Sequence, residues 1–120
     1  MKFSVNQQDI QESLSYCQGV VEKRSTLPIL SNILLDAKNS NLTITATDLD
    51  LIFINEIKNV KILEEGSTTT SSSILHDIVR KIPNGNKINF SISGSSKLLL
   101  ESEKSIFNLN CINSSEFPLM

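Results

Sequence analysis

Asp48 and Asp50, in the segment TDLDL, have the spacing of a carboxylate pair for acid–base or metal chemistry. A turn between two strands is the simpler interpretation, because aspartate is common in turns. His76 is the one histidine of the sequence and has no set of metal-ligand partners, so we expect it on the surface. The serines at 71–73 are typical of a helix cap rather than of a catalytic nucleophile. We therefore expect no enzyme, cofactor or metal site, and a small enzyme using these groups is the weakest alternative.

The two cysteines, Cys17 and Cys111, lie far apart in the sequence and do not indicate a disulfide framework. They are typical of buried thiols in a reducing cytoplasm. The 120 residues are 39% hydrophobic and 20% charged, which predicts one ordinary globular domain. The N-terminus MKFSVNQQD lacks an apolar signal-peptide core, and no segment reaches the ~18 apolar residues of a membrane span. These features predict a cytoplasmic protein without membrane contact.

The charge balance limits the kind of nucleic-acid binding that the sequence allows. A formal net charge of -2 and a pI of about 5.3 argue against a simple basic DNA-binding module. A local basic patch can still lie on an acidic protein. Two short basic pairs are candidates, Lys23 with Arg24 before TLPIL, and Arg80 with Lys81 near the end of a predicted helix.

The elements that position these residues follow from hydrophobic periodicity. Residues 2–5 alternate as a short strand, and Asn6 suits the N-cap of a helix that ends near Gly19. That helix has an apolar stripe at helical spacing: Ile10, Leu14, Cys17 and Val21. Strand patterns then cover 29–37, 41–47 and 51–58, and we expect a linker over 59–66.

The second half repeats this order. A short strand over 67–70 precedes a helix over 74–82, with Ile74, Ile78 and Ile82 on one face and Leu75 and Val79 beside them. Three strand patterns follow, over 87–93, 97–103 and 105–111. The sequence thus predicts an α+β fold in which a strand–helix–three-strand unit is used twice, over about 1–66 and 67–120. Both helices are expected on one side of antiparallel sheets.

The run RSTLPILSNILL, followed by NLTITATDLDL, resembles the N-terminal domain of the bacterial sliding clamp, the beta subunit of the replicative DNA polymerase. Further family-like segments are the opening MKF, DIVRKIPNG, SIFNLN and the closing EFP. They occur in the family's order and at nearly its spacing across all 120 residues. The resemblance rests on this agreement in register, since no single segment is a catalytic motif.

The resemblance implies a DNA polymerase processivity factor that encircles duplex DNA and tethers the replicative polymerase. Family members have three such domains per chain, and two chains close head to tail, with helices lining the hole and sheets outside. Residues 1–120 would be the first domain, and the later two would be absent from this chain. The polymerase and the clamp loader would bind through those later domains. We expect the isolated domain to be a monomer or weakly self-associating, because its strand edges are uncovered.

The resemblance also implies DNA-backbone contacts, with Arg24 as the first candidate and Lys23 beside it. Arg80 and Lys81 would face the hole, Arg80 being the stronger candidate. The alternatives are a solvated loop arginine and helix C-terminal charges that balance the macrodipole. Pro28 is expected at the entry of a strand, where it fixes the incoming loop.

Two residues depart from the basic character that the family can have in its helices, Glu12 in the first and Ser73 in the second. The lining of this domain is therefore expected to be only mildly positive. Its direct hold on DNA should be weak, which enclosure by a ring tolerates.

The strand 105–111 is the candidate subunit interface, through Phe107, Leu109 and Ile106. Phe107 and Leu109 share one face, and if that face meets the partner chain, Ile106 is the core residue. The alternative is that Phe107 and Leu109 belong to the core. The rival to the whole interpretation is a cytoplasmic protein-interaction domain that binds no DNA.

Overall fold

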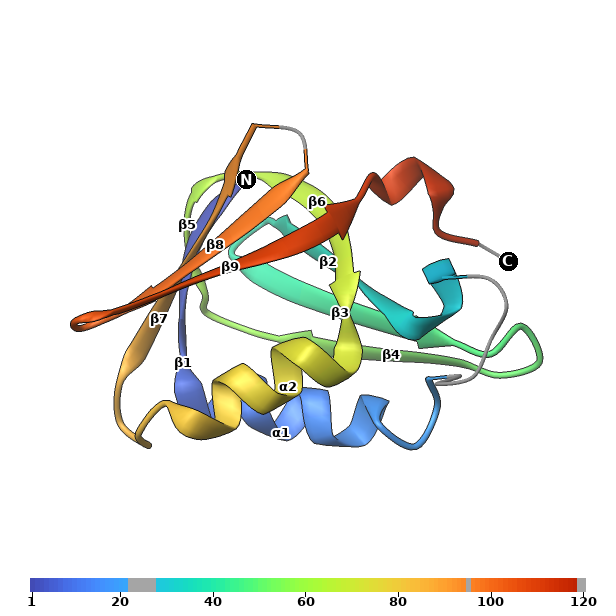
Figure 1. Ribbon diagram of the computed structural model, residues 1–120, viewed down its shortest axis with the longest axis horizontal. Helices are drawn as coiled ribbons and strands as arrows, with labels where there is room; N and C mark the ends of the chain where they lie inside the picture. The colour runs from blue at the N-terminus through green and yellow to red at the C-terminus, as the bar shows by residue number, and fades with distance from the viewer. Residues whose placement is uncertain (22–27, 95, 119–120) are drawn as a thin grey trace.

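The computed structural model describes residues 1–21, 28–94 and 96–118 (Figure 1). The first half of the chain contains β1 (Lys2–Asn6), α1 (Gln7–Cys17), a 3-10 helix (Pro28–Ser31), β2 (Asn32–Lys38), β3 (Asn41–Thr47), β4 (Ile52–Ile57) and β5 (Lys61–Glu64). The second half contains β6 (Gly66–Ser71), α2 (Ser72–Lys81), β7 (Lys87–Ser93), β8 (Lys97–Ser102), β9 (Ser105–Ile112) and a 3-10 helix (Ser114–Glu116).

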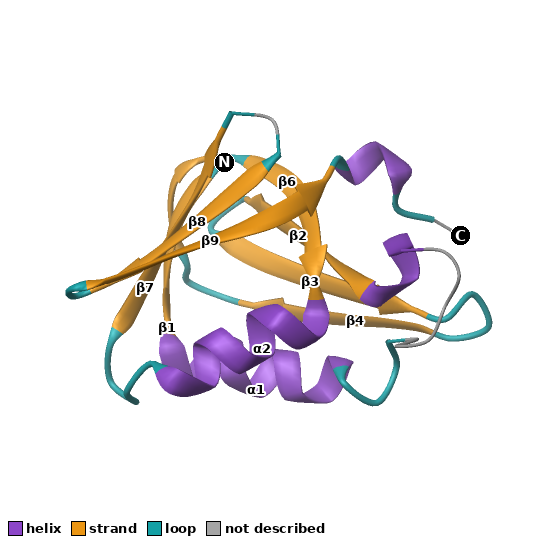
Figure 2. Ribbon diagram, in the orientation of Figure 1, coloured by secondary structure: helices purple, strands orange, loops and turns teal. Residues whose placement is uncertain are grey.

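Within these residues the strands form one antiparallel sheet, in the order β4-β3-β2-β6-β9-β8-β7-β1-β5. The sheet curves over the two helices, which lie side by side along one side of the molecule (Figure 2). The predicted α+β class is confirmed, as is the strand–helix–three-strand order in each half. The arrangement leaves one helical surface and one strand surface facing outward.

Two side-chain contacts align the helices in opposite directions. Gln7, at the start of α1, donates through Nε2 to the carbonyl oxygen of Val79 near the end of α2, at 2.9 Å. Gln18, just past the end of α1, donates to Ser72 Oγ at the start of α2, also at 2.9 Å. Because each bond joins the beginning of one helix to the end of the other, the pair is antiparallel and fixed at both ends.

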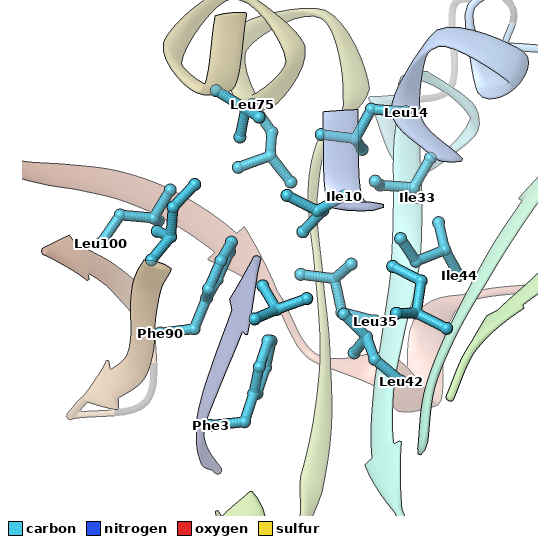
Figure 3. Packing of buried hydrophobic residues seen from close by; sticks show 14 of the residues in the cluster. Phe3, Ile10, Leu14, Ile33, Leu35, Leu42, Ile44, Leu75, Phe90 and Leu100 are labelled. Carbon is cyan, nitrogen blue, oxygen red and sulfur yellow. The ribbon is translucent and has the colours of Figure 1, made fainter. Parts of the chain in front are cut away.

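The core lies between the helix pair and the curved sheet (Figure 3). The predicted stripe of α1 is confirmed for Ile10, Leu14 and Cys17, which are fully buried. The rings of Phe3 on β1 and Phe90 on β7 stack with centroids 4.7 Å apart. With few aromatic residues available, aliphatic side chains fill most of this space, and each fully buried one stabilises the fold by about 1.5–3 kcal/mol.

The buried stripe of α2 differs from the predicted one. Leu75, Val79 and Ile82 are buried, whereas Ile74 is 54% exposed. Neighbouring helix positions are about 100° apart, so the face that contains Leu75 and Val79 turns Ile74 outward. The prediction that Ile74 belongs to the buried face is therefore wrong.

Two further expectations about the first half are corrected. The segment expected to be a linker contains β5, which pairs with β1 through Phe3 and Ile62. Pro28 does not enter a strand but begins the 3-10 helix, and β2 starts only at Asn32. Proline has a fixed φ and no N–H, both of which suit the first position of a helical turn.

Candidate nucleic-acid and subunit interfaces

Arg80 and Lys81 project from the last turn of α2. Ser71 caps the other end of this helix, because its Oγ accepts a hydrogen bond from the Ile74 N–H at 3.3 Å. Since Leu75 and Val79 face the core, the basic pair is directed to solvent, and both residues are exposed. Cations in the last turn also complement the negative end of the helix dipole. The local structure is thus compatible with a structural role and with a phosphate contact.

The outward face of α1 is polar and acidic rather than basic. Asp9 and Glu12 are exposed, and the helix contains no lysine or arginine. Tyr16 donates from Oη to Glu12 Oε1 at 3.2 Å. This hydrogen bond and the charge of Glu12 raise the pKa of Tyr16 above its usual value. Glu12 is therefore held on the surface of the helix, where it offsets the cations of α2.

The loop that contains Lys23 and Arg24 lies outside the described residues, which exclude 22–27. The described helices together carry three carboxylates and two permanent cations, on Asp9, Glu12, Asp77, Arg80 and Lys81. Ser73 is exposed near the start of α2 and adds no charge. The helical surface is thus close to neutral and slightly acidic.

The strand β9 has an edge that is open along most of its length. It pairs with β8 from Ser105 to Asn110, but with β6 only at Cys111 and Ile112. Beyond those two residues, the backbone groups on the β6 side have no strand partner among the described residues. An added strand from another chain would find hydrogen-bonding groups here.

The side chains of β9 are distributed differently from the expectation for Ile106. Phe107 lies opposite Leu100 and Leu109 opposite Leu98, both of which are fully buried. Phe107 is consequently half-buried and Leu109 is only 5% exposed. Ile106 lies on the opposite face and is 63% exposed, so its prediction as a core residue is wrong.

Sequence reasoning missed an apolar cavity beside this open edge. The cavity has a volume of about 280 Å³, and its apolar lining comes from Ile74, Leu109 and Ile112. Asn32, Thr70, Ser71, Asn108 and Asn110 complete it. Only the exposure of Ile74 signals the cavity, and that exposure depends on the helix orientation that the hydrophobic pattern left ambiguous.

The alternative catalytic groups do not form a site. Asp48 Oδ1 accepts hydrogen bonds from the N–H groups of Asp50 and Leu51, so it caps the β3–β4 turn. His76 lies on α2, a separate element. Among residues 1–21, 28–94 and 96–118, no three potential metal ligands cluster. In the same residues, neither helix is long and apolar enough to cross a membrane.

These features define a domain of the processivity-clamp type: two antiparallel helices under a curved antiparallel sheet built from a twice-used unit. The chain belongs to the family of the DNA polymerase III beta subunit, N-terminal domain, whose sequence model matches residues 1–120. Among its relatives, the beta sliding clamp of Caulobacter vibrioides is 39% identical over 121 residues, and that of Escherichia coli K12 is 33% identical over 118 residues. The aligned regions cover 100% and 98% of this chain, respectively, and 32% of each relative.

The structural comparison agrees with the sequence match. The sliding clamp of Caulobacter crescentus superposes with a TM-score of 0.94 at 39% identity, over 100% of this chain and 32% of that one. A clamp from Bartonella birtlesii, bound to griselimycin, gives 0.95 at 38% identity, again over 100% and 32%. This chain therefore spans about a third of the length of the clamps that it matches.

Proposed function

We propose that this chain is the first domain of a ring-shaped processivity factor, which retains the replicative DNA polymerase on its template in the bacterial cytoplasm. The observation that carries the proposal is the match of all 120 residues, in sequence and in fold, to beta sliding clamps. The retention is topological: a closed ring cannot leave circular DNA. The domain performs no catalysis, and it contributes an arc of lining helices and one side of a subunit contact.

In this proposal the helical surface faces the DNA. Arg80 and Lys81 on α2, and Lys23 and Arg24 before TLPIL, contact phosphate oxygens without reading sequence. The carboxylates of Asp9 and Glu12 keep the contact loose, because they repel the same phosphates. A weak hold suits a ring that must slide, and the few contacts weaken further as salt rises.

The open edge of β9 is the proposed subunit contact. A strand of the second chain pairs with the backbone of Ser105–Asn110, and Ile106 and Phe107 supply side-chain contacts. Leu109 supports this edge from within, since it is buried and lines the apolar cavity. Two further clamp domains complete each chain, and two chains form the ring. Polymerase and clamp loader bind those later domains, and the isolated domain is a monomer or associates weakly.

The test uses the parent chain, loaded by its clamp loader onto nicked circular DNA. After the circle is cut, a ring slides off the free ends, so retention should fall sharply on linear DNA and persist on circles. Blocking the ends of the linear DNA with bulky protein should restore retention. Equal retention on circular and open linear DNA would show ordinary contact binding and overturn the proposal. A parent chain that associates with neither form would favour the interaction-domain alternative.

A further inference from the structure

The turn between α2 and β7 contains an asparagine in an unusually reactive setting. Asn84 is the one asparagine of the sequence that is followed by glycine. Asn84 is exposed, Gly85 has a φ of +96°, and a Cβ placed on Gly85 would meet nothing within 4 Å. The turn is closed by a single long bond, from the Asn86 N–H to the Pro83 carbonyl oxygen at 3.3 Å. The backbone here is therefore uncrowded and weakly held.

We propose that Asn84 is a site of spontaneous deamidation, which places a carboxylate on the helical surface as the protein ages. The Gly85 nitrogen loses its proton to a solvent base and attacks the side-chain carbonyl carbon of Asn84. The bond from that carbon to the amide nitrogen breaks, ammonia leaves, and a cyclic imide remains. Water then opens the imide at either carbonyl, giving aspartate or isoaspartate. The net change is one water consumed and one ammonia released.

Other exposed asparagines are restrained by their surroundings. Asn113 Oδ1 accepts a hydrogen bond from the Ser115 N–H at 2.9 Å, which holds its side chain as a cap. Asn59 precedes Val60, whose branched and buried side chain crowds the attacking nitrogen. Among the residues that the structure describes, no hydrogen bond holds the Asn84 side chain or the Gly85 N–H. Deamidation should thus be selective for Asn84.

The position of Asn84 gives the new charge a consequence. Asn84 borders a cavity of about 370 Å³, whose other lining residues all come from α1: Gln7, Gln8, Gln11, Glu12 and Ser15. A carboxylate there joins Glu12 and follows Arg80 and Lys81 by a few residues. If the helical surface faces DNA, as the proposed function requires, deamidation lowers the attraction for phosphate. Isoaspartate also lengthens the main chain in a turn whose Asn86 carbonyl oxygen accepts from the Gln7 N–H at 2.9 Å.

The modification is tested on the folded 120-residue chain by incubation, proteolysis and mass spectrometry of the Asn84 peptide. Aspartate and isoaspartate are separated by chromatography, and an isoaspartate-specific methyltransferase serves as a second readout. The Asn84 peptide should convert before any other asparagine peptide. Its rate should rise about tenfold per pH unit near neutrality, because the deprotonated fraction of the attacking amide rises by that factor.

Asn84→Gln is the control, since its longer side chain must form a larger and slower ring. Conversion that occurs only in urea-unfolded chain, or equally at Asn113, would overturn the proposal. A separate arm compares DNA retention of the parent ring with Asn84→Asp and Asn84→Gln. Conversion at Asn84 with unchanged retention in Asn84→Asp would leave the modification established and overturn its placement beside DNA, so the two failures are distinguishable.

Discussion

Asp77 Oδ1 accepts a hydrogen bond from Arg80 Nη2 at 2.8 Å, one turn apart on α2, and more than half of each side chain is exposed. An exposed pair of this kind contributes only about 0.2–1 kcal/mol to folding. Its larger effect is on any phosphate that approaches Arg80, because Asp77 both neutralises the guanidinium and occupies one of its donors. The pair therefore sets how strongly α2 attracts DNA.

Substitutions of the two residues are predicted to have opposite effects on DNA binding by the parent ring. Arg80→Ala should weaken binding and reduce the slope of log K against log salt by about 0.9, the value for one phosphate contact. Asp77→Asn should strengthen binding, because it frees the guanidinium. Fluorescence anisotropy with duplex DNA at several salt concentrations measures both. Identical salt slopes for the parent and Arg80→Ala would mean that Arg80 does not contact phosphate.

The two faces of β9 should separate assembly from folding. Leu109→Ala is predicted to destabilise the domain by about 2–4 kcal/mol, because it removes buried methyl groups and leaves a cavity. Ile106→Lys should change the free energy of unfolding by no more than about 0.5 kcal/mol, since the side chain is exposed. Urea unfolding of the 120-residue chain measures both values.

Ile106→Lys should nevertheless weaken association of the parent chains if the β9 edge is the subunit contact, since a buried lysine at an interface is costly. Sedimentation of the parent chain measures the dissociation constant, with the exposed Leu63→Lys on β5 as a control away from that edge. An unchanged dissociation constant would exclude Ile106 from the interface.

Sequence pattern was sufficient where one periodicity dominated. Ile10, Leu14 and Cys17 specified the face of α1, and alternation through Leu42, Ile44 and Ala46 specified β3. It was insufficient on α2, where apolar residues cover most of the circumference. There, only packing decides that Leu75 rather than Ile74 is buried.

The remaining differences depend on contacts distant in sequence. Residues 61–64 became a strand because β1 offered an unpaired edge, which no local pattern announces. Ile106 faces solvent because Leu98 and Leu100 on β8 take Leu109 and Phe107 onto the core face. The candidate DNA contacts came from the family resemblance rather than from pattern, since a nearly neutral helical surface has no electrostatic signature of its own.

The β3–β4 turn contains a strained leucine whose replacement should be favourable. Leu49 has a φ of +81°, in the region that suits glycine, and its N–H donates to Thr47 Oγ1 at 3.0 Å. Leu49→Gly relieves about 1–2 kcal/mol of strain and loses about 0.5–1 kcal/mol through greater backbone freedom. We therefore expect the free energy of unfolding to rise by about 0.5–1 kcal/mol.

Leu51→Gly is the matched control for Leu49→Gly. Leu51 is similarly exposed but has no positive φ, so glycine there should only destabilise, by about 0.5–1 kcal/mol. Urea denaturation of both variants gives the comparison. Equal losses of stability would mean that the turn does not hold Leu49 under strain.

Cys17 should make the stability of the domain fall in alkaline solution. Burial raises the pKa of this thiol to about 12, whereas an unfolded cysteine ionises near pH ~8.5. Between these values the folded state binds the proton and the unfolded state does not, so stability decreases by up to about 1.4 kcal/mol per pH unit. Below pH ~8.5 the contribution is present in full, and it is lost as the pH rises to about 12.

The comparison with Cys17→Ala isolates this contribution from the lysines and the tyrosine, which titrate in both proteins. The alanine variant starts less stable because it leaves a cavity beside Ile10 and Leu14. Its deficit should shrink with each pH unit, since alanine has no proton to lose. Urea unfolding of both proteins from neutral pH upward measures the difference. A deficit that stays constant with pH would mean that the Cys17 thiol ionises as readily in the folded chain as in the unfolded one.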